Sequence, residues 1–150
     1  MPQTTQTTQI IVLDTNVVLD LVVFRDPGAE SIARAIRSGA VVPVTSSDCL
    51  EELHRVLAYP NLKLDAPDRL AAFASFRAQA RLVEMPAAPA APLPLCADPD
   101  DQKFLELAWH SGARWLITKD RALLRLARAV ARLGRFALVG PADFDRGAAP

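Results

Sequence analysis

The chain has 150 residues, with 17 basic and 17 acidic side chains, so its formal net charge is zero at pH 7. Hydrophobic residues make up 51% of it, which excludes an intrinsically disordered protein and suffices for one compact domain with a sizeable core. Two cysteines and two histidines (Cys49, Cys96, His54 and His110) exclude a disulfide framework and a zinc site of the usual Cys/His kind, so any bound metal must have oxygen ligands.

The first 24 residues contain neither a targeting signal nor a membrane span. Residues 1–9 are rich in Thr and Gln and lack the basic start of a signal peptide, so we expect a flexible leader. The apolar stretch that follows is interrupted by Asp14, Asn16 and Asp20, and it is shorter than the ~20 apolar residues that a transmembrane helix needs. We therefore expect a soluble, cytoplasmic protein without a membrane partner.

The first half of the sequence alternates apolar runs rich in β-branched residues with segments of helical periodicity. Ile10–Leu13 is short and apolar, which predicts a buried strand, and the apolar pattern continues over Thr15–Phe24 as a helix. The next elements predicted are a helix over Ala29–Ser38 that ends at Gly39, a strand over Ala40–Val44, a helix from Ser46 or Ser47 to about Ala58, a helix that begins at Pro67, and a short strand within Arg81–Met85.

The second half continues this alternation after a connecting loop, the Pro- and Ala-rich segment Pro86–Leu95. Asp98 followed by Pro99 is a strong helix start, because an acid at the N-cap and proline at the first helical position are both favoured. The elements predicted from there are a helix to Ser111, a strand over Arg114–Thr118, a helix over Asp120–Leu133 and a strand over Arg135–Val139. Helices between successive strands predict one α/β domain at 10–144, with a central parallel sheet of about five strands, helices on both faces, and a tail at 145–150.

Three aspartates fall where such a sheet would form a site. Asp14 follows the first predicted strand and Asp120 follows the fourth, so both lie at the carboxyl edge of the sheet, where ligands bind in open α/β folds. Asp101 shares the inward face of its helix with Phe104 and Leu105. A carboxylate that faces inward is costly unless something neutralises it, and a bound cation would do so.

Each acid also has a structural interpretation when it is taken alone. Asp98 and Asp120 can each cap a helix, and Asp14 can form an Asx-turn. Spacing leaves open whether Glu51 or Glu52 faces the site. The signal is therefore the joint placement of the acids at one edge of the sheet. Carboxylates without Cys or His suit a hard cation such as Mg²⁺ or Mn²⁺, which can activate water and offset charge on a phosphodiester.

Four ordered segments resemble those of the PIN-domain family. They are Ile11–Val17 (IVLDTNV), Glu52–Leu57 (ELHRVL), Asp98–Leu105 (DPDDQKFL) and Leu116–Asp120 (LITKD), and the closing Pro141–Phe144 is also typical. The likeness spans about residues 10–144 and is greatest to the toxins of toxin–antitoxin modules, the VapC-like ribonucleases. The tetrapeptide Leu-Asp-Thr-Asn alone is a modest signal, whereas the full ordered set is strong.

The resemblance implies a three-layer α/β/α PIN-like fold, Mg²⁺- or Mn²⁺-dependent cleavage of RNA, and an antitoxin protein as a partner. Matching positions make Asp14, Glu52, Asp101 and Asp120 the catalytic, metal-binding acids, Asp98 an auxiliary metal ligand, and Asn16 and Thr118 polar support. Glu52 is preferred to Glu51 because the subgroup's pattern is Glu-Leu followed two residues later by Val-Leu. Other branches place the third acid one residue later, where this chain has Gln102, but the inward position of Asp101 favours Asp101.

Charge and apolar surface suggest further contacts. Residues 1–101 carry 8 basic and 13 acidic side chains, a formal net charge of −5. Residues 102–150 carry 9 basic and 4 acidic side chains, a formal net charge of +5. Four arginines recur at helical spacing after Asp120, namely Arg121, Arg125, Arg128 and Arg132, and they form either a solvated helix face or a surface for phosphates or an acidic partner. Asn16–Phe24 is more apolar than one core needs, so we expect a homodimer or a partner contact there.

Three other functions compete with a nuclease. A catalytically inactive PIN-like module that binds protein or RNA would have acids that do not converge or do not bind metal. A receiver-like signalling domain would match Thr118 and Lys119, but it needs a phospho-acceptor aspartate where Met85-Pro86 stands. A phosphatase that starts with Asp-x-Asp is disfavoured because Asn16 replaces the second aspartate.

Overall fold

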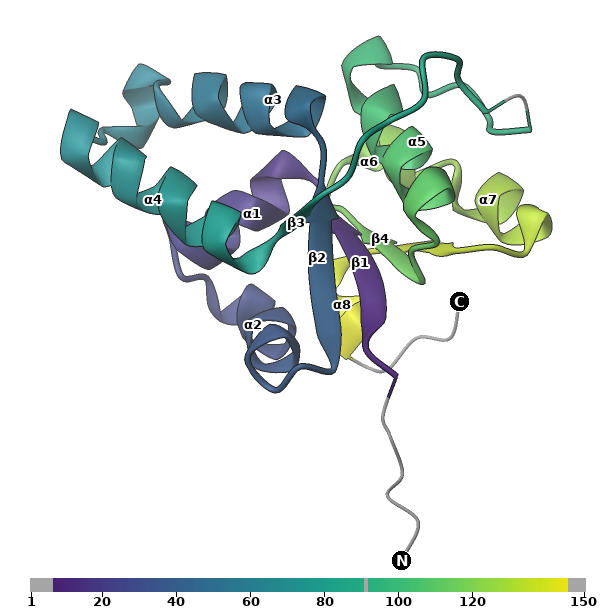
Figure 1. Cartoon of the computed structure of the whole chain (residues 1–150), viewed down its shortest axis with the longest axis horizontal. Helices are drawn as coiled ribbons and strands as arrows, with labels where there is room; N and C mark the ends of the chain where they lie inside the picture. Colours follow the sequence, from purple (N-terminus) through teal and green to yellow (C-terminus); the bar gives the residue numbers. More distant parts are fainter. Residues whose placement is uncertain (1–6, 91, 146–150) are drawn as a thin grey trace, which may run out of the picture.

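The computed structural model describes residues 7–90 and 92–145, and they form an α/β/α sandwich (Figure 1). Within these residues the sheet has five strands in the order β3-β2-β1-β4-β5, with bounds β1 Gln9–Leu13, β2 Val41–Thr45, β3 Arg81–Leu82, β4 Trp115–Ile117 and β5 Ala137–Val139. Every pair of neighbouring strands is parallel. The predicted fold class, three layers around a parallel sheet of about five strands, is confirmed.

Helices cover both faces of this sheet. One side carries α1 Thr15–Val22, α2 Glu30–Arg37, α3 Ser47–Leu57 and α4 Ala66–Gln79, and the other carries α5 Gln102–Ser111, α6 Arg121–Leu124 and α7 Ala127–Leu133 (Figure 1). The last helix, α8 Pro141–Asp145, packs against α2. In the described part of the chain, three short 3₁₀ turns each begin with proline: η1 Pro27–Ala29, η2 Pro60–Leu62 and η3 Pro99–Asp101. Of the helices in the described residues, none combines the length and the apolar character that crossing a membrane requires.

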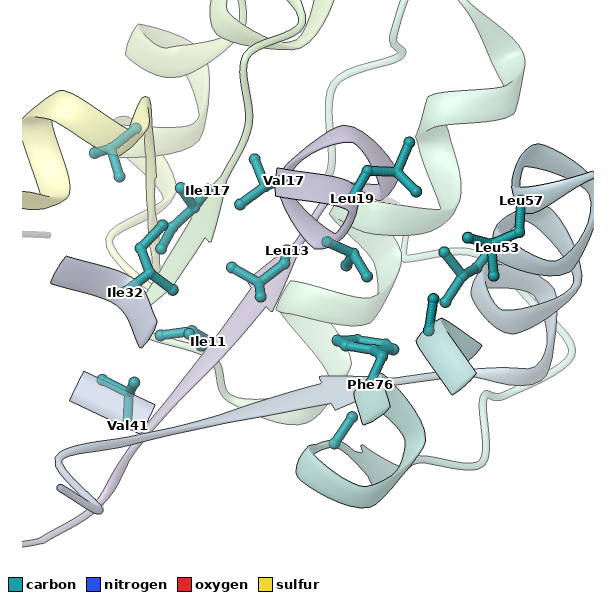
Figure 2. Close-up of a cluster of buried hydrophobic side chains, with 14 of the residues drawn as sticks. Ile11, Leu13, Val17, Leu19, Ile32, Val41, Leu53, Leu57, Phe76 and Ile117 are labelled. Carbon is teal, nitrogen blue, oxygen red and sulfur yellow. The ribbon is translucent and has the colours of Figure 1, made fainter. Parts of the chain in front are cut away.

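The two faces carry separate hydrophobic clusters, because successive strand residues point to opposite sides of a sheet. Ile11 and Leu13 of β1 pack toward α1–α4, whereas Val12, between them, packs toward α5–α7. Figure 2 shows the first cluster, whose labelled members are Ile11, Leu13, Val17, Leu19, Ile32, Val41, Leu53, Leu57, Phe76 and Ile117. This packing on both faces fixes the ends of the central strands.

Local signals in the sequence place most helix ends. Ser46 caps α3 by accepting the N–H of Cys49 at 3.4 Å, and Asp98 caps η3 by accepting the N–H of Asp100 at 3.0 Å. Gly112 ends α5 with φ of 72°, a left-handed conformation that favours glycine. The expected helix start near Ser46 is therefore confirmed, whereas Asp98 begins the 3₁₀ turn η3 and the α-helix that was expected from there starts at Gln102.

Four elements differ from the sequence prediction. The single helix expected over Asp120–Leu133 is two helices, because the N–H of Leu126 bonds the carbonyl of Leu123 in a tighter turn at 2.9 Å. The first helix ends at Val22, β3 has only two residues, and α8 was not predicted. The expected leader and tail fall mainly on residues 1–6 and 146–150, outside the described residues, and Gln9 belongs to β1.

Candidate active site

The candidate site lies at the carboxyl edge of the sheet, where the strand order reverses between β1 and β4. From β1 the order runs to β2 and β3 on one side and to β4 and β5 on the other. A crevice at such a reversal is the usual ligand site of an open α/β sheet. Asp14 directly follows β1 and Thr118 directly follows β4, so both residues lie at this point.

Asp14 is buried, at 4% exposed, and donors from its own chain surround its carboxylate. The N–H of Val17 donates to Oδ1 at 2.9 Å, and the hydroxyl of Thr118 donates to Oδ2. Burial raises the pKa of Asp14, while the hydrogen bonds from Thr118, Val17 and the backbone N–H of Lys119 oppose that rise. Asp14 therefore caps α1 and is also tied to the end of β4.

Thr118 links two acids of the candidate site. It is fully buried, and its hydroxyl both donates to Asp14 and accepts the N–H of Asp120 at 2.9 Å. Asp120 in turn caps α6, because its Oδ1 accepts the N–H groups of Ala122 at 2.7 Å and Leu123 at 3.2 Å. Capping thus holds Asp120 in place beside the end of β4.

Asp101 is different, because one of its carboxylate oxygens is both buried and without a donor. Oδ2 is buried and, among the residues that the structure describes, has no hydrogen-bond partner. Burial first, and then the negative charges of Asp120, Asp98, Glu52 and Asp14, raise the pKa of Asp101 to about 7. The acids that were singled out in the sequence therefore share one electrostatic environment.

Glu52 enters this environment from α3, together with a lysine that sequence reasoning missed. Lys103 Nζ lies 2.8 Å from Glu52 Oε1, and both side chains are largely buried, at 17% and 16% exposed. Lys103 also donates to the carbonyl of Asp100 at 2.5 Å, and the hydroxyl of Thr15 donates to Glu52 Oε2. The sequence contained one signal: Lys103 lies in the first turn of α5, where the helix dipole disfavours a cation, so a specific anionic partner is expected.

A second ion pair that sequence reasoning missed lies beside the site. Lys119 Nζ is 2.6 Å from Oδ2 of Asp20, a buried acid on α1. Lys119 lies between Thr118 and Asp120, so this pair ties the loop after β4 to α1. Asp20 was noted in the sequence only as an interruption of an apolar stretch, and nothing local indicated its partner.

The four predicted acids line one cavity of about 130 Å³. Its lining residues are Asp14, Thr15, Asn16, Glu52, Val56, Asp101, Phe104 and Asp120. Asn16 borders the cavity but is exposed, and Asp98 is exposed outside this lining. The cavity brings together side chains from β1–α1, α3, η3–α5 and the β4–α6 loop, and Glu52 rather than its neighbour Glu51 lines it.

A hard divalent cation fits the donor set of this cavity. The polar atoms are mainly carboxylate oxygens, which Mg²⁺ and Mn²⁺ prefer, and Asp101 Oδ2 is a buried anionic atom that lacks a donor. The acids are not closed around one point, however: within residues 7–90 and 92–145, no group of three His, Cys, Asp or Glu side chains is positioned to hold a metal ion. Binding an ion would therefore require the carboxylates to draw together.

Comparisons with known proteins agree with this architecture. Residues 10–122 match the sequence model of the family described as PIN domain, and that span contains every acid of the candidate site. A chain in the crystal structure of VapBC2 from Rickettsia felis, bound to a DNA fragment from their promoter, superposes with a TM-score of 0.58 and 13% sequence identity, over 87% of this chain and 98% of that chain. At this identity the superposition establishes a shared fold. No curated protein matches the sequence.

Proposed function

Because the chain belongs to the PIN-domain family, a family of nucleases, we propose that it is a metal-dependent endoribonuclease that hydrolyses RNA phosphodiester bonds. The observation that carries this proposal is the buried, donor-free oxygen of Asp101 in a cavity lined by three further carboxylates. A buried anion in that setting is unfavourable unless a cation or a proton neutralises it. A divalent cation would neutralise the carboxylates of the cavity and would also offset the negative charge of a phosphodiester during hydrolysis.

We assign Asp14, Glu52, Asp101 and Asp120 as the catalytic, metal-binding acids, with Asp98 as an auxiliary ligand. A bound Mg²⁺ or Mn²⁺ would activate water and offset the negative charge of the scissile phosphate. Thr118 fixes Asp14 and Asp120 relative to each other, so that these two carboxylates need little reordering. Lys103 balances the charge of Glu52, so Glu52 would add less net negative charge around an ion than the other acids do.

We further propose that the chain is the toxin of a toxin–antitoxin pair in the cytoplasm. The similar chain from Rickettsia felis belongs to VapBC2, a complex bound to promoter DNA, and this supports an antitoxin protein as partner here. A homodimer is the other contact that we propose: most apolar side chains of the segment 16–24 pack into the core, but Phe24 is 55% exposed and is the side chain that a second copy would cover. Expression of the chain without its antitoxin should arrest growth, and unaffected growth would count against the toxin proposal.

A catalytically inactive PIN-like module that binds protein or RNA is the second candidate function. Two observations favour it: the described acids are not closed around one point, and Lys103 already supplies a cation to Glu52. This alternative predicts that Mn²⁺ neither binds the protein nor stimulates cleavage. Metal binding therefore separates the two candidate functions.

The test is a cleavage assay on mixed RNA with Mn²⁺, with Mg²⁺ and with EDTA. We expect the wild-type chain to cleave only with metal, and Asp14→Asn and Asp101→Asn to be inactive yet folded. Asp100→Asn is the matched control, because Asp100 is exposed next to Asp101 and outside the cavity. Full activity in Asp14→Asn, or activity of the wild-type chain in EDTA, would reject the mechanism.

A further inference from the structure

A row of four unpaired arginines begins next to the candidate active site. Arg121, Arg125, Arg128 and Arg132 are exposed, and we call them the arginine ridge. In the described part of the chain, none of the four guanidinium groups has a hydrogen-bond or ion-pair partner. Arg121 directly follows Asp120, an acid of the cavity, so the ridge starts at the edge of the site.

The ridge lies on one side of α6 and α7, opposite to the side that packs on the sheet. Leu123 and Val130 are fully buried, and they alternate with the arginines at helical spacing. The arginines therefore project away from the core even though the helix is interrupted near Leu126. In an uninterrupted α-helix, the eleven residue steps from Arg121 to Arg132 would span about 16 Å along the axis. Both α6 and α7 pack on the edge strand β5, so the ridge lies over that edge of the sheet (Figure 1).

The charge pattern of this segment does not serve the stability of the helices. Residues 121–142 contain five arginines and no acidic residue, so no Glu or Asp stands at i−4 or i+4 to pair with the ridge. Arg121 and Arg125, and likewise Arg128 and Arg132, place like charges four residues apart, which disfavours a helix. A helix face kept soluble by charge alone normally mixes both signs. Among the described residues, the chain itself therefore supplies no anion to neutralise the ridge.

We propose that the arginine ridge binds the phosphate backbone of single-stranded RNA and leads it toward the acidic cavity; this inference rests on the proposed ribonuclease function. Guanidinium groups match phosphate oxygens well, because each presents several donors in a planar fork. The acidic cavity itself repels a polyanion, so substrate binding needs positive charge placed beside it. The ridge supplies that charge next to Asp120.

The test compares two double variants of equal charge change. Arg128→Gln/Arg132→Gln removes two ridge charges from α7, away from the cavity, and Arg34→Gln/Arg81→Gln removes two exposed charges from α2 and β3. Each is combined with Asp101→Asn, which stops cleavage, and binding of a fluorescent single-stranded RNA is measured by anisotropy at several salt concentrations. We expect the ridge variant to bind about tenfold more weakly than the control, and the slope of log Kd against log salt to fall by roughly 1.4, or ~0.7 for each lost phosphate contact.

Two further readouts keep the inference falsifiable. With Asp101 intact, the ridge variant should cleave at an unchanged kcat and a raised KM, and its thermal stability should equal or exceed that of the wild-type chain. Equal RNA affinity and equal salt slope in the two double variants would overturn the proposal. The proposal would also be overturned if the ridge variant bound RNA with normal affinity but lost the affinity of the wild-type chain for a polyglutamate peptide, since that result indicates an acidic protein partner. Failure of the nuclease proposal is a different result: the wild-type chain would bind RNA through the ridge and not cleave it with Mn²⁺.

Discussion

Replacing Asp101 by asparagine should stabilise the metal-free protein while it removes the metal response. Asparagine keeps the shape of the side chain and removes a charge that burial disfavours first, and the neighbouring charges of Asp120, Asp98, Glu52 and Asp14 after it. The pKa of Asp101 is raised from 3.8 to about 7 in the folded chain, so folding disfavours the ionised form. At about 1.36 kcal/mol per pKa unit, the cost of the ionised form is at most about 4 kcal/mol. Because the side chain is only partly buried, solvent screening reduces that figure, and we expect about 1–2 kcal/mol.

The size of this effect depends on pH. Between the unfolded pKa and the folded pKa, the native chain binds the proton and the unfolded chain has lost it, so the stability of the wild-type chain falls as pH rises through this window. Above the folded pKa the penalty is complete. Asp101→Asn should therefore resemble the wild-type chain near pH 4 and exceed its stability by about 1–2 kcal/mol near pH 8, in EDTA.

Urea unfolding followed by tryptophan fluorescence, at both pH values and with EDTA or Mn²⁺, measures this difference. Mn²⁺ should stabilise the wild-type chain at the higher pH and leave Asp101→Asn nearly unchanged, because binding to the native state alone shifts unfolding. Asp100→Asn is the control and should follow the wild-type chain throughout. If Asp101→Asn were no more stable than the wild-type chain at high pH in EDTA, the carboxylate would carry no penalty and the reasoning would fail.

Two further variants test the ion pairs beside the cavity. Lys103→Met removes the ammonium from Glu52, so the metal-free chain should lose stability and the rise in Tm caused by Mn²⁺ should grow. Lys103→Arg is the control and should keep both values near those of the wild-type chain. An equal loss of stability with and without Mn²⁺ would show that Lys103 has a purely structural role. Lys119→Met leaves the buried carboxylate of Asp20 without its partner, which should lower the free energy of unfolding by about 1–3 kcal/mol. Asp20→Asn in the same chain should restore most of this loss. Chemical denaturation measures both effects, and additive losses in the double variant would contradict the coupling.

The fold could be predicted from the sequence wherever local signals and burial agree. Ile10–Leu13 is apolar throughout because β1 is central and packed on both faces, so periodicity alone locates it. The break between α6 and α7 was missed because Arg125 and Leu126 are ordinary helix residues, and tertiary packing decides the tighter turn there. A short strand was predicted within Arg81–Met85, but its length of two residues depends on pairing with Val44 and Thr45, which the segment itself does not encode.

The candidate site could be predicted to the extent that it follows strand ends. Asp14 and Asp120 were placed from the strands before them, and Asp101 from its helix face. The reversal of strand order between β1 and β4 could not be read from the sequence, because strand order is set by long-range packing. The same limit applies to Lys103 and Glu52, which are 51 residues apart in the chain.

The distribution of hydrogen-bond donors inside the cavity indicates which acid contributes most to binding an ion. Thr118, Val17 and Lys119 supply donors to Asp14, and the start of α6 supplies them to Asp120. Thr15 and Lys103 likewise occupy both oxygens of Glu52. Only Asp101, among the four carboxylates that line the cavity in the described chain, has a buried oxygen without a donor. Replacing each acid by its amide should therefore reduce Mn²⁺ affinity most at Asp101 and least at Glu52, because an amide at Glu52 removes a charge that Lys103 already balances.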